Sequence, residues 1–283
     1  MRFAPIIATL AALATSLALA PEARAGTAST VAFTETAPVS SNAEIVRRMV
    51  SGATRARVLQ SGVNLASQPL DPSNEQFLVY VPADKPVGGY GLLVFVPPWK
   101  QAQIPDGWAD ALDRQGFIFV TAANSGNDAD DFARRIPLAL IAEQNVLKRY
   151  AIDPSRIFVG GFSGGSRVAL KLALGYPDLF RGALLDAGAD PIDTDALPLP
   201  PADLFEKFKA SRLVFVAGDG DTGALRMDAA SLSSLRAHCV LNTEEQVLPA
   251  VGHSIADAGA FASALDALLK TGPADRPACS NGL

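Results

Sequence analysis

One serine stands in a sequence pattern that is typical of an activated nucleophile. Residues 161–165 read Gly-Phe-Ser-Gly-Gly, which fits the pattern G-x-S-x-G with Ser163 at its centre. The preceding residues predict a short buried strand (157–160) and the following ones a helix, so Ser163 would occupy the sharp turn between them. Glycines two positions before and after it allow strand and helix to pass without Cβ clashes. We therefore interpret Ser163 as a nucleophile.

A serine hydroxyl needs an adjacent base, and histidine is the usual one because its pKa lies near neutrality. The sequence contains only two histidines, His238 and His253. His238 falls inside a helical pattern. His253 follows a predicted strand (244–248) in a loop that can reach the turn at Ser163. We expect His253 to be the base and His238 to lie on a helix face.

The base needs a carboxylate that orients its ring and stabilises its charged form. A predicted strand at 213–217 is followed by Gly-Asp-Gly-Asp, which offers Asp219 and Asp221. Asp186 and Asp190, after the preceding strand, are weaker candidates. Either of the first two gives the chain order serine, aspartate, histidine.

These residues require a sheet whose strands end at one edge. Five-residue apolar segments alternate with helical patterns and are bounded by Gly, Pro and polar residues, at 92–96, 117–121 and 213–217 among others. Continuous apolar strands separated by helices predict a parallel sheet covered on both faces. Ligand chemistry in such sheets lies at the carboxyl ends of the strands, where Ser163 stands.

Two further features of the chain predict how the sheet begins and how one helix is divided. Residues 55–65 and 77–81 have strand character on either side of a polar break, which indicates an antiparallel opening to the sheet. A long helix is expected from about residue 129 to 150. Pro137 is expected to kink or split it.

The composition excludes several function classes. The 283 residues carry a net charge of −5 with a pI near 5.1 and contain no dense basic run, so we expect no nucleic-acid partner. A C-x-x-C motif is absent, and we expect neither a metal nor a cofactor.

The first residues have the pattern of an export signal. Arg2 precedes an apolar run at 6–20, and Ala23-Arg-Ala25 has the small-x-small form of a cleavage site. We expect a signal peptide at 1–25 and a periplasmic or secreted mature chain. A retained membrane anchor is the alternative, but the run is shorter than the roughly 20 residues that a spanning helix needs. No later segment is long and apolar enough to span.

The remaining chain divides into two parts of unequal size. Residues 26–54 are rich in Ala, Ser and Thr and are expected to form a tether or peripheral segment, and residues 55–283 a catalytic domain. Cys239 and Cys279 are the only cysteines, and in an exported chain such a pair predicts one disulfide. Two unpaired buried thiols are the alternative.

Four stretches carry a resemblance to a known family: residues 150–169 around Ser163, Tyr-Pro-Asp-Leu-Phe at 176–180, Gly-Asp-Gly-Asp at 218–221 and Gly-His-Ser at 252–254. The chain resembles the α/β-hydrolases, and more narrowly the polyhydroxybutyrate-depolymerase-like and feruloyl-esterase-like secreted esterases, over about residues 77–270. This resemblance implies the α/β-hydrolase fold, with a mostly parallel central sheet and helices on both faces. The short segment between 185 and 213 predicts no large lid.

The resemblance also implies a reaction, the hydrolysis of a small or polymeric carboxylic ester by Ser163, His253 and an acid. It favours Asp221 as the acid, with Asp219 as the alternative. The oxyanion would be stabilised by the N–H of Gly164 and by one from the loop after strand 92–96. That loop reads Pro-Pro-Trp, and proline has no N–H, so Trp99 is the expected second donor.

Two other functions remain open at this point. An amide hydrolase of the same fold would use the same residues on a peptide bond. A non-catalytic binding protein is suggested only by the two prolines in the oxyanion loop. The aromatic residues Trp99, Trp108 and Phe162 suggest an apolar pocket for the substrate.

Overall fold

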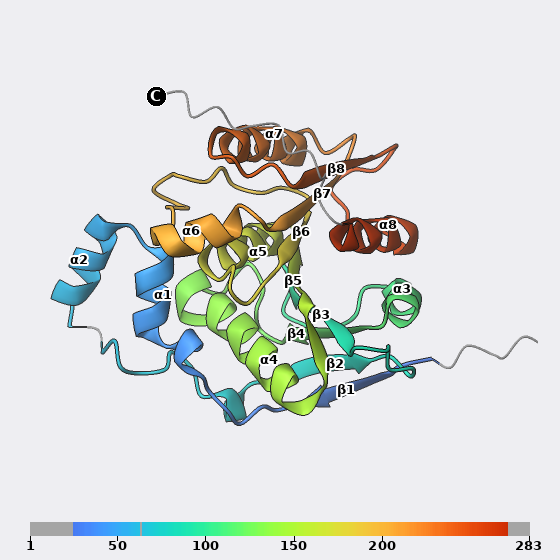
Figure 1. Cartoon of the computed structure of the whole chain (residues 1–283), viewed down its shortest axis with the longest axis horizontal. Coiled ribbons are helices and arrows are strands. Elements are labelled where there is room, and N and C mark those ends of the chain that lie inside the picture. Colours follow the sequence, from blue (N-terminus) through green and yellow to red (C-terminus); the bar gives the residue numbers. More distant parts are fainter. Residues whose placement is uncertain (1–24, 63, 271–283) are drawn as a thin grey trace, which may run out of the picture.

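A single sheet runs through the computed structural model, which describes residues 25–62 and 64–270 (Figure 1). In this part of the chain the sheet has eight strands in the order β1-β2-β4-β3-β5-β6-β7-β8. β1 and β4 pair antiparallel with β2, and the other neighbours are parallel. The strands are β1 (Thr27–Val31), β2 (Phe77–Val81), β3 (Tyr90–Val96), β4 (Phe117–Ala122), β5 (Ile152–Phe162), β6 (Gly182–Asp186), β7 (Arg212–Gly218) and β8 (Thr243–Leu248). The predicted mostly parallel sheet is confirmed.

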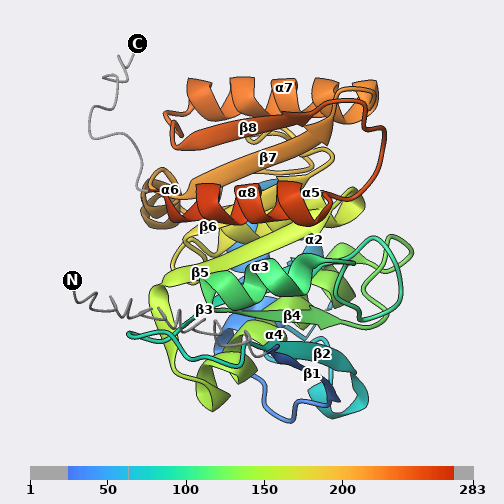
Figure 2. The same ribbon diagram turned by 90° about the vertical axis from the view of Figure 1, so that its right-hand side faces the viewer.

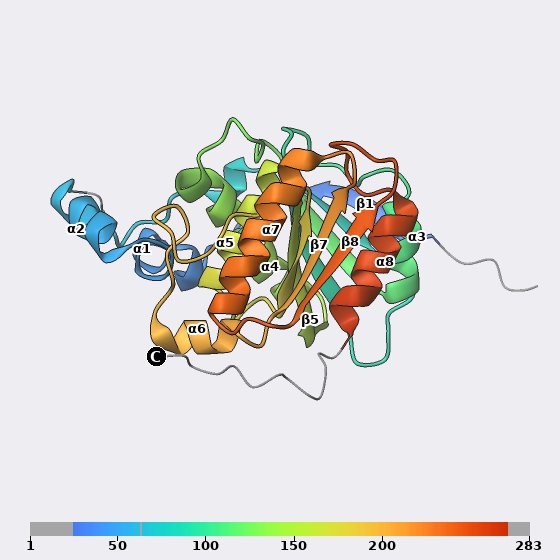
Figure 3. The same cartoon turned by 90° about the horizontal axis from the view of Figure 1, so that it is seen from above.

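Helices cover both faces of this sheet, which is seen face-on in Figure 2 and from above in Figure 3. On one face lie α3 (Trp108–Gln115) and α8 (Ala258–Leu269). On the other lie α1 (Asn42–Met49), α4 (Ile136–Arg149), α5 (Gly164–Gly175), α6 (Ala202–Phe208) and α7 (Thr222–Ala237). Residues of β3 alternate between the two hydrophobic clusters that result: Leu92 and Val94 face α4 and α5, whereas Leu93 and Phe95 face α3 and α8.

The prediction of a strand at residues 55–65 is wrong. Residues Gly52–Gln60 form the helix α2, which projects from the body and buries none of its side chains (Figure 1). The Ser51 hydroxyl accepts a hydrogen bond from the Thr54 N–H and caps this helix, and its Ala, Arg and Leu residues are good helix formers. The strand that opens the sheet is β1, which pairs with β2.

The long helix predicted around Pro137 runs without a break but changes type just before this residue. A π-helical turn (Asp131–Arg135) precedes α4, and Pro137 lies in the first turn of α4, where its missing N–H is not needed. Besides α2, the helix α6 was also not predicted; it lies in the short connection between β6 and β7. This connection contains no other helix or strand, in agreement with the expectation of no large lid.

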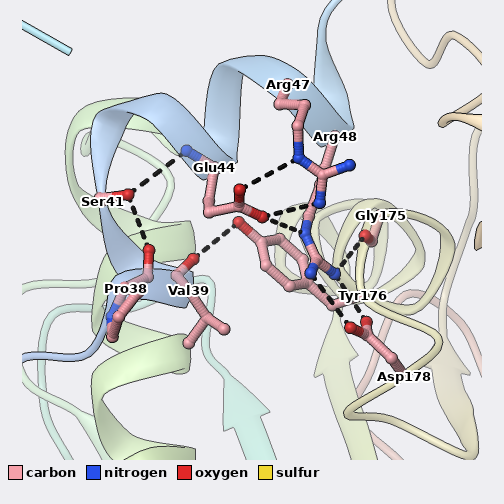
Figure 4. Close-up of polar contacts among 9 residues, drawn as sticks. All are labelled: Pro38, Val39, Ser41, Glu44, Arg47, Arg48, Gly175, Tyr176 and Asp178. Atoms are coloured by element: carbon pink, nitrogen blue, oxygen red, sulfur yellow. Dashed lines mark hydrogen bonds and ion pairs between the residues drawn. The ribbon is translucent and has the colours of Figure 1, made fainter. Parts of the chain in front are cut away.

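The segment expected to be a tether or peripheral layer is joined to the body by buried contacts (Figure 4). The side chain of Arg48 on α1 is 8% exposed and holds both carboxylate oxygens of Asp178, at 2.6 and 3.0 Å. Its Nε also donates to Glu44, and the Tyr176 hydroxyl donates to the Val39 carbonyl at 2.9 Å. These contacts attach the segment to the carboxyl end of α5, the helix that begins after Ser163.

Two predictions fall on residues outside the described part of the chain. All of the predicted signal peptide (1–25) except its last residue, Ala25, lies outside the described residues, and so does Cys279, which belongs to residues 271–283. Cys239, at the other end of the predicted disulfide, follows α7 with a positive φ of 64°. Among the described residues, no helix combines the length and apolar character that a membrane crossing requires.

Candidate active site

Ser163 lies on a strained turn between β5 and α5. Its φ and ψ are 56° and −121°, a conformation that non-glycine residues rarely adopt, and its N–H donates to the Asp186 carbonyl at 2.7 Å. A Cβ on Gly165 would lie 1.9 Å from the Val96 carbonyl oxygen, and one on Gly161 would lie 2.2 Å from the Gly165 backbone. The turn therefore requires glycine at both positions of the G-x-S-x-G pattern.

Three predicted site residues meet at the carboxyl edge of the sheet. His253, in the loop after β8, has its Nε2 2.9 Å from the Ser163 Oγ. Its Nδ1 lies 2.5 Å from Oδ2 of Asp221, which follows β7. Ser163, His253 and Asp221 thus form a continuous hydrogen-bonded chain, which is the arrangement that a nucleophile, its base and an orienting acid require.

Asp221 has a second contact that keeps it ionised. It is the N-cap of α7, and its Oδ1 accepts a hydrogen bond from the Ala224 N–H at 3.1 Å. Burial acts to raise the pKa of Asp221, but the hydrogen bonds from the Ala224 N–H and from His253 outweigh it and lower the pKa below its ordinary value. The carboxylate is therefore charged at neutral pH, as an acid that stabilises a histidinium must be.

The other candidate residues do not contact His253. Asp219 is exposed, and Asp190 accepts hydrogen bonds from Arg167. His238 ends α7, with its Nε2 3.1 Å from Asp193. Asp186 is buried and accepts the N–H of Ala256 at 2.8 Å, three residues after His253.

Asp228 is a second buried acid close to these loops, and its charge state is expected to govern stability. Its Oδ1 accepts the Ala189 N–H at 2.9 Å, whereas its Oδ2 is buried without a partner among the described residues. Burial raises the pKa of Asp228 from 3.8 to about 7. Because the folded state holds the proton more tightly, the stability it contributes is full below about pH 4 and is lost as the pH rises through about 7.

We therefore expect Asp228→Asn to stabilise the protein by roughly 1–4 kcal/mol at about pH 8 and to have little effect near pH 4, since asparagine cannot ionise. Thermal unfolding across this pH range measures the difference. The matched control is Asp195→Asn, because Asp195 is exposed and has no hydrogen-bond partner among the described residues. A wild-type protein as stable as the variant at pH 8 would contradict the prediction.

The two expected oxyanion donors have free N–H groups. Neither the Gly164 nor the Trp99 N–H has an acceptor among the described residues. The Trp99 ring packs against Phe95 and Phe162, with centroids 6.4 and 6.3 Å away. The role predicted for Trp99 stays a prediction. A residue that the sequence did not indicate, Asn127, lies directly against Gly164, where a Cβ would come within 2.1 Å of its Oδ1.

Ser163 opens onto a cavity of about 560 Å³ whose lining is polar and charged. The aromatic residues suggested as a pocket do not line it; Trp108 is fully buried between Phe119 and Phe261. The lining consists of Asn127, Asp131, Arg135, Ser163, Gly164, Arg167, Lys171, Ala187, Asp221, Gly223, Ala224, Met227 and His253. The sequence did contain a signal for two of them, since Arg167 and Lys171 follow Ser163 at helical spacing. In the described part of the chain, no cluster of His, Cys, Asp or Glu has the form of a metal site.

Comparison with solved structures identifies the class to which this fold belongs. An S-formylglutathione hydrolase from Staphylococcus aureus superposes with a TM-score of 0.57 over 87% of this chain and 98% of its own, at 13% identity. A thermostable esterase gives a TM-score of 0.51 over 68% of this chain and 56% of its own, at 15% identity. The chain has the α/β-hydrolase fold, as predicted.

Sequence comparison narrows the resemblance to one group within that class. The chain is similar to poly(3-hydroxyalkanoate) depolymerase C of Paucimonas lemoignei, with 31% identity over 134 residues, or 42% of this chain and 32% of that protein. It is also similar to the poly(3-hydroxybutyrate) depolymerase of Ralstonia pickettii, with 28% identity over 103 residues, or 31% of this chain and 21% of that protein. The matches thus span a third or less of these relatives, and no family model matches the chain. The predicted resemblance to depolymerase-like esterases is confirmed.

Proposed function

We propose that this protein is a serine hydrolase that cleaves carboxylic esters, with Ser163 as nucleophile, His253 as base and Asp221 as acid. The observation that carries the proposal is the pair of contacts at His253, 2.9 Å to the Ser163 Oγ and 2.5 Å to Asp221. The pair stands at the mouth of a cavity large enough for a small ester. The two relatives named as depolymerases support an ester as the substrate.

In the first half of the reaction, His253 Nε2 takes the hydroxyl proton while Ser163 Oγ attacks the ester carbonyl carbon. Asp221 holds the ring by Nδ1 and stabilises the imidazolium. The N–H groups of Gly164 and Trp99 donate to the developing oxyanion. The tetrahedral species then expels the alcohol, which receives its proton from His253.

In the second half, water replaces the alcohol. His253 takes a proton from the water, which attacks the acyl-enzyme, and returns that proton to Ser163 Oγ as the acid leaves. Each step uses only groups of this chain and water, so the proposed mechanism requires no metal or cofactor.

We also propose that the chain is exported and cleaved after Ala25. The Gly26 nitrogen lies 3.1 Å from both the Tyr80 hydroxyl and the Asp113 Oδ2. Cleavage at the predicted site would turn this nitrogen into an ammonium group beside a carboxylate. The other oxygen of this carboxylate, Asp113 Oδ1, is buried and has no partner among the described residues.

The experiment that tests the proposed activity is covalent labelling combined with turnover. We expect a fluorophosphonate probe to label the protein once and peptide mass spectrometry to locate the label on Ser163. Esters of 4-nitrophenol from acetyl upward, and oligomers of 3-hydroxybutyrate, should be hydrolysed. A folded protein that is neither labelled nor active on any of these esters would overturn the proposal.

A further inference from the structure

The helix that begins after the nucleophile presents two cations along the cavity. Arg167 and Lys171 follow Ser163 by one and two helical turns, on the same face of α5, and all three line the cavity. At 1.5 Å per residue, Arg167 lies about 6 Å and Lys171 about 12 Å beyond Ser163 along the helix axis. The cavity therefore extends from the nucleophile along a row of positive charge.

A third cation closes this part of the cavity. Arg135 is 4% exposed, and its guanidinium donates to the carbonyls of Ser125 and Pro97, at 3.0 and 3.2 Å. Its Nη1 donates to Asp131 at 3.2 Å, and the other oxygen of Asp131 accepts from Lys171 Nζ at 2.6 Å. Arg135 is thus held in place by the protein and adds a fixed positive charge to the wall.

The donors of the two α5 cations are only partly used. Arg167 donates its Nε–H to Asp190, and neither of its terminal nitrogens has a partner among the described residues. Lys171 has one acceptor, Asp131, for three N–H groups. Arg167 can therefore offer a planar pair of N–H groups to an anion in the cavity, in the geometry that matches a carboxylate.

The charges of this wall also do not balance. Its three cations face two carboxylates, Asp131 and Asp190, so one positive charge is left. The other carboxylate of the lining, Asp221, is also charged, but it lies at the Ser163 end beside His253, so the positive excess is local to the stretch of wall around Arg167 and Lys171. A carboxylate placed beside Arg167 and Lys171 would balance this local excess.

We propose that this cavity binds a carboxylate of the substrate through Arg167 and Lys171, and that the enzyme prefers esters that carry such a group near the scissile bond. The inference rests on the proposed function and names its substrate class, a carboxylate-bearing ester. Partial hydrolysis of a polyester or diester produces molecules of this kind, each with a free carboxylate and a remaining ester. An ester hydrolysis would therefore supply the substrate.

The test compares each acid with its neutral, isosteric amide. One pair carries the carboxylate on the acyl side: 4-nitrophenyl hydrogen adipate against 4-nitrophenyl adipamate. The other carries it on the alcohol side: 3-(butanoyloxy)propanoate against 3-(butanoyloxy)propanamide. We expect kcat/KM for the acid to exceed that for the amide by about tenfold or more in one of the pairs, and added salt to reduce the ratio.

Substitutions test whether Arg167 and Lys171 produce the preference for the acid over the amide. Arg167→Gln and Lys171→Gln should each lower the acid-to-amide ratio about tenfold, and Arg167→Lys, which keeps the charge without the planar donor pair, should lower it less. The matched control is Arg226→Gln on α7, because Arg226 is exposed and does not line the cavity. This control removes the same charge and should keep the wild-type ratio.

A binding measurement separates failure of this inference from failure of the proposed function. Calorimetry on the Ser163→Ala variant, with monomethyl adipate against methyl adipamate, needs no turnover and should show the acid binding more tightly. Ratios near one in both substrate pairs, with an active wild-type enzyme, would overturn the inference and leave the function intact. Absence of all ester hydrolysis would overturn the function, and equal binding of acid and amide would then overturn the inference as well.

Discussion

Replacing Ser163 with alanine is expected to lower kcat for ester hydrolysis by about 10⁴-fold or more, while the fold is kept. The substitution removes only the Ser163 hydroxyl, whose Oγ lies 2.9 Å from His253 Nε2. Without it no acyl-enzyme forms, and His253 can at most activate water. The measurement is kcat on 4-nitrophenyl butyrate, together with loss of fluorophosphonate labelling.

Ser254→Ala is the matched control for this variant. Ser254 is exposed beside His253, and its described hydrogen bond is from its backbone N–H to the Gly252 carbonyl, which alanine also makes. The control should therefore keep wild-type activity. Retention of more than about a tenth of the wild-type kcat in Ser163→Ala, with purified and folded protein, would exclude Ser163 as the nucleophile.

Replacing Asp221 with asparagine is expected to lower kcat by about 10³–10⁴-fold. Asparagine removes the charge that stabilises the imidazolium. The asparagine amide can also donate a hydrogen bond to His253 Nδ1. This favours the tautomer with the proton on Nε2, which then has no lone pair to accept the Ser163 proton. Steady-state kinetics on the same ester give the effect, which should appear in kcat and kcat/KM alike.

Stability measurements distinguish this role of Asp221 from its structural role. Asp221 also caps α7 through the Ala224 N–H, but asparagine is as good an N-cap as aspartate, so the unfolding temperature should change little. The matched control is Asp219→Asn, two residues earlier, because Asp219 is exposed and does not contact His253. Loss of activity in Asp219→Asn, with Asp221→Asn unaffected, would reverse the assignment of the acid.

The elements around the site could be predicted from sequence because each depends on local rules. Apolar strands bounded by breakers, a proline in a long helix and glycines flanking Ser163 each leave a pattern within a few residues. The candidate base was chosen in the same way, because only one of the two histidines, His253, follows a predicted strand. Choosing between Asp219 and Asp221 required the structure, because both follow β7 and only Asp221 has a hydrogen bond to His253.

Other features depended on contacts that no local pattern records. β1 is rich in Ala, Ser and Thr, and its strand conformation comes from pairing with β2. α2 buries no side chain, so it lacks the amphipathic pattern by which helices are recognised. The charged cavity combines Asp131 and Arg135 from the segment before α4 with residues of α5, and only the folded chain brings these together.

Asp186 contacts both halves of the site, the turn that carries Ser163 and the loop that carries His253. Its carbonyl accepts the Ser163 N–H, and its carboxyl group accepts the N–H of Ala256, just beyond His253. The end of β6 thus contacts both the turn at Ser163 and the loop that carries His253. We therefore expect this anchor to keep the loop of His253 near Ser163 when other exposed residues between β8 and α8 are substituted.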